Sequence, residues 1–255
     1  MFSLMFLLVG CTAIADLKDD VQGATSPLVL EGLVLGIAPP TSAEVDLTGT
    51  AFEDGAAAVA TIADASSVDG LDEAPIEGAE VALLLESGGR VVMVDEGGGR
   101  YTCTAADGLT YTDGDSATLS VDYPGEDTTS SAQVQLPRAP TVSFPASVPR
   151  GQPLHVDLAG QSFDNALVVV VDAATGETSW SNYPTTIEDM YNLTHGSGSL
   201  TVDVPGTALA EESIYLVGVA GLVNAEQDSL TNLNTLLSAL TAGRLVFSAV
   251  STVPP

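Results

Sequence analysis

Basic residues are the scarcest component of this 255-residue sequence. Lys and Arg together number 6, against 34 Asp and Glu residues, and the formal net charge is −28. A field of that sign repels phosphate backbones and anionic lipid surfaces, so the composition disfavours a nucleic-acid partner. Three explanations of the acidity stay open: a solvated and colloidally stable surface, adaptation to a saline habitat, and calcium binding by carboxylates that converge from loops.

Cysteine and histidine are nearly absent too, which removes most catalytic and metal-binding patterns. The chain has Cys11, Cys103, His155 and His195, and none of the H-E-x-x-H or C-x-x-C spacings that bind zinc. The nucleophile elbow G-x-S-x-G, the phosphate loop and the dinucleotide fingerprint are missing as well. We therefore predict that the protein is not an enzyme and has no cofactor, with calcium as the one ion left open.

The opening apolar run, Phe2 to Val9, is too short to cross a bilayer as a helix, which takes about 20 residues. Its length fits the apolar region of a secretory signal peptide, and it is followed by small Gly10 and then by Cys11. Residues 12–26 include many polar and turn-prone residues, as expected of a tether: Asp16, Lys18, Asp19, Asp20, Gln22, Gly23, Thr25 and Ser26. The alternative is a buried first strand followed by an ordinary core thiol.

Leu8-Val9-Gly10-Cys11 resembles the lipobox of bacterial lipoproteins. The resemblance implies that residues 1–10 are a signal peptide and that the mature chain begins at Cys11, with acyl chains such as palmitate on its sulfur and its new amino group. Several chains would hold the protein at a membrane, whereas a single chain binds only marginally. The resemblance also implies a place in the cell envelope, and Thr12 favours the outer membrane. The face of the membrane stays open.

Cys103 would have no partner within the chain if Cys11 carries lipid, and an intramolecular disulfide is then excluded. The alternation in Arg100-Tyr101-Thr102-Cys103-Thr104 puts Tyr101 and Cys103 on one face of a strand. We therefore predict that Cys103 is a small buried hydrophobe and not a catalytic thiol.

The remaining sequence predicts an all-β fold of two β-sandwich domains in tandem. In the first domain, residues 27–136, glycine-rich turns separate strands expected at residues 28–37, 78–85, 90–94, 100–104, 116–123 and 131–136. Residues 56–63 could form either a strand or a short helix. Residues 137–140, Pro-Arg-Ala-Pro, are typical of a stiff linker.

The second domain, residues 141–255, alternates more clearly. Its expected strands are residues 141–144, 154–158, 166–171, 178–183, 200–204, 214–220 and 245–253, and the alternation at 154–158 points His155 outward. Leucines at positions 230, 233, 236, 237 and 240 recur at helical spacing. They predict one amphipathic helix near residues 229–242.

Both domains resemble known module families. Glu77-Gly78-Ala79-Glu80-Val81-Ala82-Leu83, followed by Gly97 to Tyr101, resembles transthyretin-like modules of the carboxypeptidase-regulatory type, in which residues 41–75 would be an insertion. Glu211 to Val219 resembles the sixth strand of immunoglobulin or fibronectin-like sandwiches, where an early tyrosine, here Tyr215, closes a corner through its hydroxyl. The resemblances imply non-catalytic modules that serve as spacers or binding domains.

One candidate site is a loop in which Asp107, Asp113 and Asp115 lie around Gly114. A calcium ion could gather carboxylate and backbone oxygens there. The spacing is not that of an EF-hand, and aspartate beside glycine is also common in ordinary turns.

A second candidate site is the aromatic cluster of Trp180, Tyr183 and Tyr191. Aromatic rings beside amide side chains could stack on sugar rings and so bind a ligand. The alternative is that the single tryptophan anchors a core against the strand expected at residues 166–171.

These features predict a membrane-anchored lipoprotein of the cell envelope with a non-catalytic binding, adhesive or structural role. Its partners would be the membrane, through the lipid, and a protein or a polysaccharide. The alternatives are a calcium-dependent carbohydrate-binding module and a carbohydrate-active hydrolase. A hydrolase would require two carboxylates that face each other across a cleft at about 5 to 10 Å.

Overall fold

The computed structural model describes residues 26–39, 45–48, 50, 52–53, 55–64, 75–123, 128–183 and 199–254. Within these ranges the chain is nearly all β-strand, with short 3-10 turns and no helix of seven or more residues. The predicted all-β class is therefore confirmed. No helix in this part of the chain is long and apolar enough to cross a membrane. Cys11 with its lipobox, Tyr191 and His195 lie outside the described residues.

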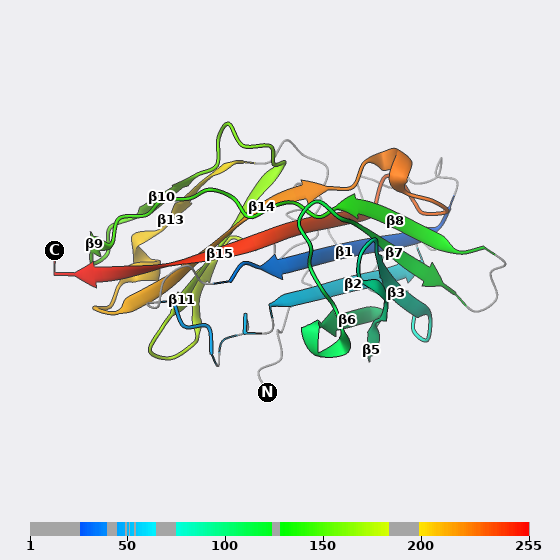
Figure 1. Cartoon of the computed structure of the whole chain (residues 1–255), viewed down its shortest axis with the longest axis horizontal. Coiled ribbons are helices and arrows are strands. Elements are labelled where there is room, and N and C mark those ends of the chain that lie inside the picture. The colour runs from blue at the N-terminus through cyan, green and yellow to red at the C-terminus, as the bar shows by residue number, and fades with distance from the viewer. Residues whose placement is uncertain are drawn as a thin grey trace.

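The described strands form one large sheet and two smaller ones (Figure 1). The nine-stranded sheet A has the order β12-β11-β14-β15-β1-β2-β6-β5, and β9 also pairs with β15. Its strands are β1 (Leu28–Ile37), β2 (Ala56–Asp64), β5 (Val94–Gly97), β6 (Arg100–Thr104), β9 (Ser147–Pro149), β11 (Asn165–Asp172), β12 (Thr178–Ser181), β14 (Ile214–Asn224) and β15 (Ala239–Val253).

The smaller sheets complete the architecture. Sheet B has the order β4-β3-β7-β8, with β3 (Glu80–Leu85), β4 (Gly89–Val92), β7 (Ser116–Asp122) and β8 (Ser130–Gln135). Sheet C pairs β10 (Leu154–Asp157) with β13 (Thr201–Val204). The 3-10 turns are η2 (Ala105–Asp107), η3 (Gly206–Leu209) and η4 (Gln227–Ser229).

β15 is the long central strand of sheet A. It pairs antiparallel with β14 on one side and parallel with β1 on the other. Figure 1 shows β1 and β15 running side by side in the same direction along the long axis of the molecule. Sheet A thus contains strands from both sides of the predicted linker at 137–140, while the division into two domains remains a prediction.

The first core lies between sheet A and sheet B. Alternate residues of β1, β2 and β6 point toward sheet B, as Leu30, Ile62 and Tyr101 do, and each is fully buried. From the other side, Leu83 of β3 and Leu119 of β7 fill the same core. The period of two in these strands is what puts one apolar face inward.

The second core lies between sheet A and sheet C, on the same face of sheet A as the first core. In β15, Leu240 and Ala242 belong to the first core and Val250 to the second, at an even spacing that keeps all three on one face. Val156 of β10 and Val204 of β13 close the second core from sheet C. The two sandwiches therefore share one sheet and one of its faces.

The opposite face of sheet A carries a third apolar cluster. It includes Val169 of β11, Leu216 of β14 and Phe247 of β15, and it packs against a segment between β1 and β2. Phe52 of that segment meets Phe247 with ring centroids 5.2 Å apart. β11 is thus covered on both faces, which explains why its residues 166–171 are all apolar.

The helix predicted near residues 229–242 is wrong. This stretch contains the last residue of η4, a bridge from Thr231 to Ser131, and the start of β15. Asn232 adopts a left-handed φ of 54°, which a right-handed helix does not allow, and the Asn234 side chain accepts hydrogen bonds from nearby backbone amides. Leu233 and Leu240 are buried all the same, so the leucine spacing reflected core contacts made by a loop and a strand.

The structure gives different results for two short segments, residues 56–63 and residues 141–144. Residues 56–63, undecided from sequence, form β2. The strand expected at residues 141–144 is absent, because the backbone N–H and carbonyl of Thr141 both pair with the side-chain amide of Gln161, at 2.9 and 3.0 Å, instead of with a neighbouring strand. Pairing with β15 begins only at Ser147, in β9.

Candidate functional site

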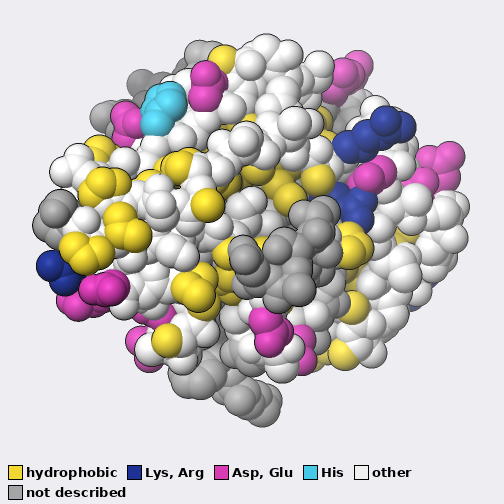
Figure 2. Space-filling view, turned by 60° about the vertical axis from the view of Figure 1, so that its left-hand side comes forward, with side chains coloured by type: hydrophobic (Ala, Val, Ile, Leu, Met, Phe, Trp, Pro, Cys, Tyr) yellow, Lys and Arg dark blue, Asp and Glu magenta, His cyan; other side chains and the backbone are white. Residues whose placement is uncertain are grey.

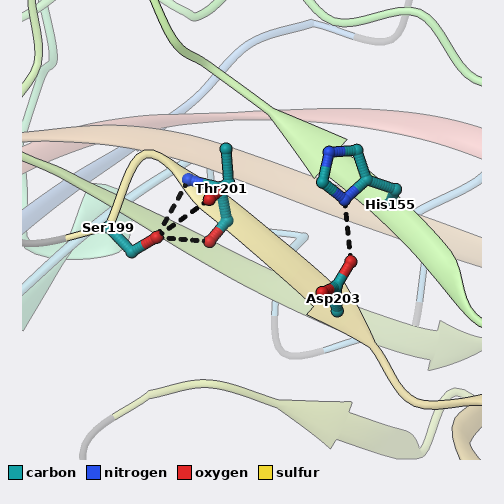
Figure 3. Close-up of polar contacts among 4 residues, drawn as sticks. All are labelled: His155, Ser199, Thr201 and Asp203. Atoms are coloured by element: carbon teal, nitrogen blue, oxygen red, sulfur yellow. Dashed lines mark hydrogen bonds and ion pairs between the residues drawn. The ribbon is translucent and has the colours of Figure 1, made fainter.

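The described histidine, His155, forms an ion pair on the outer surface of sheet C. β10 and β13 are antiparallel with His155 directly opposite Asp203, and His155 Nδ1 lies 2.7 Å from Asp203 Oδ1 (Figure 3). The hydrogen bond to Asp203 raises the pKa of His155, and the charges of Asp203 and Asp157 act in the same direction. The two side chains are 62% and 80% exposed, so water screens the pair.

Ser199 is close in sequence to Asp203 but is not connected to the ion pair. Its hydroxyl donates to the Thr201 carbonyl at 2.5 Å and accepts from the Thr201 backbone N–H at 3.1 Å. Figure 3 shows Ser199 facing Thr201, while His155 faces Asp203. A serine nucleophile must contact its base, and here the hydroxyl is instead used to cap the start of β13.

The three aspartates of the predicted calcium loop have separate partners. Asp107 accepts from the Thr104 backbone N–H at 2.8 Å and so caps η2. Asp113 pairs with Arg244, and Asp115 accepts from the Ser87 hydroxyl. In the described part of the chain no three His, Cys, Asp or Glu side chains come together as a metal-binding group. The fold therefore does not bring these carboxylates together around one ion.

The predicted aromatic cluster is divided between two faces of sheet A. Trp180 in β12 is opposite Val170 in β11 and packs on the second core. Tyr183 packs on the third cluster, across the sheet, and burial raises its pKa to about 12. Residues three apart on an extended chain point to opposite sides, so the two rings do not form one stacking surface. Tyr191 lies outside the described residues.

Cys103 lies in the first core, as predicted from the alternation of β6. The residue is 1% exposed, and burial raises the pKa of its thiol to about 12. The thiolate, which is the reactive form of a cysteine, is therefore suppressed at neutral pH.

Sequence reasoning missed a polar junction between the two cores. Arg244 of β15 lies opposite Gly36 of β1, and its guanidinium is 5.6 Å from the centre of the Tyr111 ring while it pairs with Asp113. The Tyr111 hydroxyl donates to the Pro137 carbonyl at 2.9 Å, at the start of the predicted linker. Glycine is needed at position 36, because an added Cβ would lie 2.3 Å from the Tyr111 ring.

No local signal could have revealed this junction, since the sequence separates Arg244 from Asp113 by 131 positions. The contact between His155 and Asp203 was easier to predict from sequence than the contact between Arg244 and Asp113. Both residues belong to outward-facing positions of expected strands, and only the pairing of those strands was missing.

The acidic surface shows no single focus on the face drawn in Figure 2. Acidic side chains there lie in small groups with hydrophobic and uncharged atoms between them. Searches against known protein families and against curated proteins find no match for this chain.

Proposed function

We propose that this protein is a lipid-anchored lipoprotein of the cell envelope with a non-catalytic structural or presenting role. In this proposal Cys11 carries the acyl chains, residues 12–26 supply reach, and the β-sandwich part projects from the membrane. The acidic composition fits this arrangement. A net charge of −28 repels an anionic lipid surface, so the β-sandwich part is held away from the membrane to which the lipid anchors it.

The observation that carries the proposal is the burial of Cys103. Acylation of a thiol needs a reachable sulfur that can become a thiolate, and Cys103 is neither exposed nor readily ionised. Of the two cysteines in the sequence, Cys11 is therefore the one suited to accept a lipid.

The absence of catalysis is proposed from the way the reactive side chains are used. Among the described residues, His155 is held in an exposed ion pair, Ser199 bonds Thr201, and Cys103 is packed in a core. Each of these groups has a structural role and none contacts another as nucleophile and base. Trp180 is likewise used for packing, which favours a structural role over the stacking of sugar rings.

The test is membrane fractionation of the full chain in a bacterial host with a lipoprotein-processing pathway. We expect Cys11→Ser to move the protein from the membrane to the soluble fraction and to abolish labelling by a fatty-acid probe. Cys103→Ala is the matched control, and it should keep both the membrane location and the label. A Cys11→Ser variant that stays in the membrane fraction would refute the anchor.

A further inference from the structure

The pairing of β1 with β15 has a geometry suited to bearing tension. The strands are parallel and neighbours in sheet A, with seven residue pairs in register from Glu31 with Ala239 to Ile37 with Leu245. β15 continues beyond β1 to Val253. The start of β1 and the end of β15 therefore lie at opposite ends of the same line, along the long axis seen in Figure 1.

A pull applied between the segment before β1 and the segment after β15 slides these two strands along each other. The hydrogen bonds of a parallel pair are slanted but evenly spaced between the two strands, so a sliding force loads all of them together. A pull at two points on the same end of a strand pair loads one bond at a time. The first geometry resists a much larger force with the same bonds.

Hydrogen bonds beyond the seven paired positions extend the region in which β1 is held to β15 and to the loop before it. At the start of β1, the Asn234 backbone N–H donates to the Leu28 carbonyl at 2.7 Å, and the Leu30 N–H donates to the Ser238 hydroxyl at 3.1 Å. At its other end, the Ala38 N–H donates to the Leu245 carbonyl at 2.7 Å. β1 is thus tied to β15 and its preceding loop along its full length.

Burial protects these bonds from competing water. Leu30 and Val34 of β1 and Leu240, Ala242 and Leu245 of β15 are each at most 2% exposed. Hydrogen bonds in such surroundings are stronger than exposed ones and are not easily replaced by bonds to water. Both strands are also interior to sheet A, because β14 flanks β15 and β2 flanks β1.

We propose that the β1–β15 pair is a mechanical clamp that keeps the protein folded under tension between its amino-terminal and carboxyl-terminal sides. The proposal rests on the proposed function in one respect, since an amino-terminal lipid anchor is what would transmit tension into β1. The resistance itself is a property of the folded chain and needs no membrane.

Single-molecule force spectroscopy on the full chain with Cys11→Ser tests the clamp. One set of molecules is pulled by handles at the two chain ends. The other is pulled between the carboxyl-terminal handle and a thiol introduced by Glu212→Cys, an exposed position just before β14. Ile214 pairs with Ser251, so this second geometry peels β14 from β15 at one end. Burial of Cys103 keeps the handle specific.

We expect the end-to-end geometry to break at a force severalfold higher than the peeling geometry. Ser238→Ala, which removes the partner of Leu30, should lower the end-to-end force and leave the peeling force unchanged. Ser248→Ala, in the part of β15 beyond β1, is the matched control and should change neither. Equal forces in the two geometries would overturn the clamp, whereas failure of the lipid anchor would appear only in the fractionation of Cys11→Ser.

Discussion

The two sandwiches use the same sheet but differ in how they cover it. Sheet B brings four strands to the first core, whereas sheet C brings two and leaves β9 and η3 to fill the remaining edge of the second. Most of the largest fully buried side chains belong to the first core: Tyr101, Leu30, Ile62, Leu83, Leu119, Leu136, Leu233 and Leu240. The four strands of sheet B can enclose large side chains, whereas the two strands of sheet C leave part of the second core to be closed by smaller residues and loops.

This difference predicts unequal costs for the same truncation in the two cores. Leu83→Ala should lower the free energy of unfolding by an amount near the upper end of about 2–5 kcal/mol, because two sheets hold the cavity open. Leu158→Ala, just after β10, should cost less, since loops beside it can collapse into the space. Chemical denaturation of both variants measures the difference.

Leu84→Ala is the control for these truncations. Leu84 follows Leu83 but is 40% exposed on the outer face of sheet B, and its loss should change stability by no more than about 0.5 kcal/mol. Equal costs for Leu83→Ala and Leu158→Ala would show that the narrower cover is as rigid as the wider one.

A second comparison concerns one tyrosine hydroxyl in each sandwich. The Tyr101 hydroxyl accepts from the Ala79 N–H at 3.1 Å and donates to the Ile76 carbonyl at 3.0 Å, all buried. Tyr101→Phe leaves both backbone groups unpaired and should cost about 1–3 kcal/mol.

The Tyr215 hydroxyl bonds the backbone of Glu211, with contacts of 3.3 and 3.4 Å; Tyr215 is buried, whereas Glu211 is exposed. Because water can replace that hydroxyl, Tyr215→Phe should cost about 1 kcal/mol or less. Thermal unfolding of the two variants checks the order, and a larger effect of Tyr215→Phe would contradict it.

The junction between the cores offers a smaller effect. Asp113→Asn removes the partner of Arg244, whose side chain is 18% exposed, and should lower the free energy of unfolding by about 1 kcal/mol. Glu80→Gln breaks the pair between Glu80 and Arg90, which is far more exposed, and should have almost no effect. Urea denaturation at low and high salt separates the two, since salt weakens exposed pairs most.

The smallest effect belongs to the ion pair of sheet C. The pKa of His155 is higher in the folded state than in the unfolded state. The ion pair therefore contributes its full stabilisation at a pH below the unfolded pKa of His155, and this stabilisation is lost as the pH rises through the folded pKa. NMR titration should give a lower pKa for His155 in Asp203→Asn than in the unmodified chain. An unchanged pKa would mean that the pair does not form in solution.

Local patterns predicted individual elements well because they depend on neighbouring residues. β1 begins and ends at the residues expected, β6 likewise, and alternation correctly put Cys103 inside and His155 outside. The same reasoning failed at residues 229–242, where leucine spacing fitted a helix while Asn232 and Asn234 stabilised a turn. Spacing reports which residues are buried, and several backbone conformations can bury the same set.

The residues of the two candidate sites are separated by the fold for a related reason. Asp107, Asp113 and Asp115 are neighbours in sequence, but each carboxylate bonds a different part of the fold. Trp180 and Tyr183 are neighbours too, and the extended backbone sends them to opposite faces. Proximity in sequence thus did not become proximity of functional groups.

By itself the sequence determined most of the strands, their inward faces, several hairpin turns and the burial of Cys103, because these follow from the period of two in an extended chain. Only the tertiary structure decided that β1 pairs with β15, that both sandwiches share one sheet, and that Tyr111 meets Arg244 above Gly36. Such pairings join residues that are far apart in the chain. Their choice depends on how whole apolar faces fit together, which no local stretch of sequence encodes.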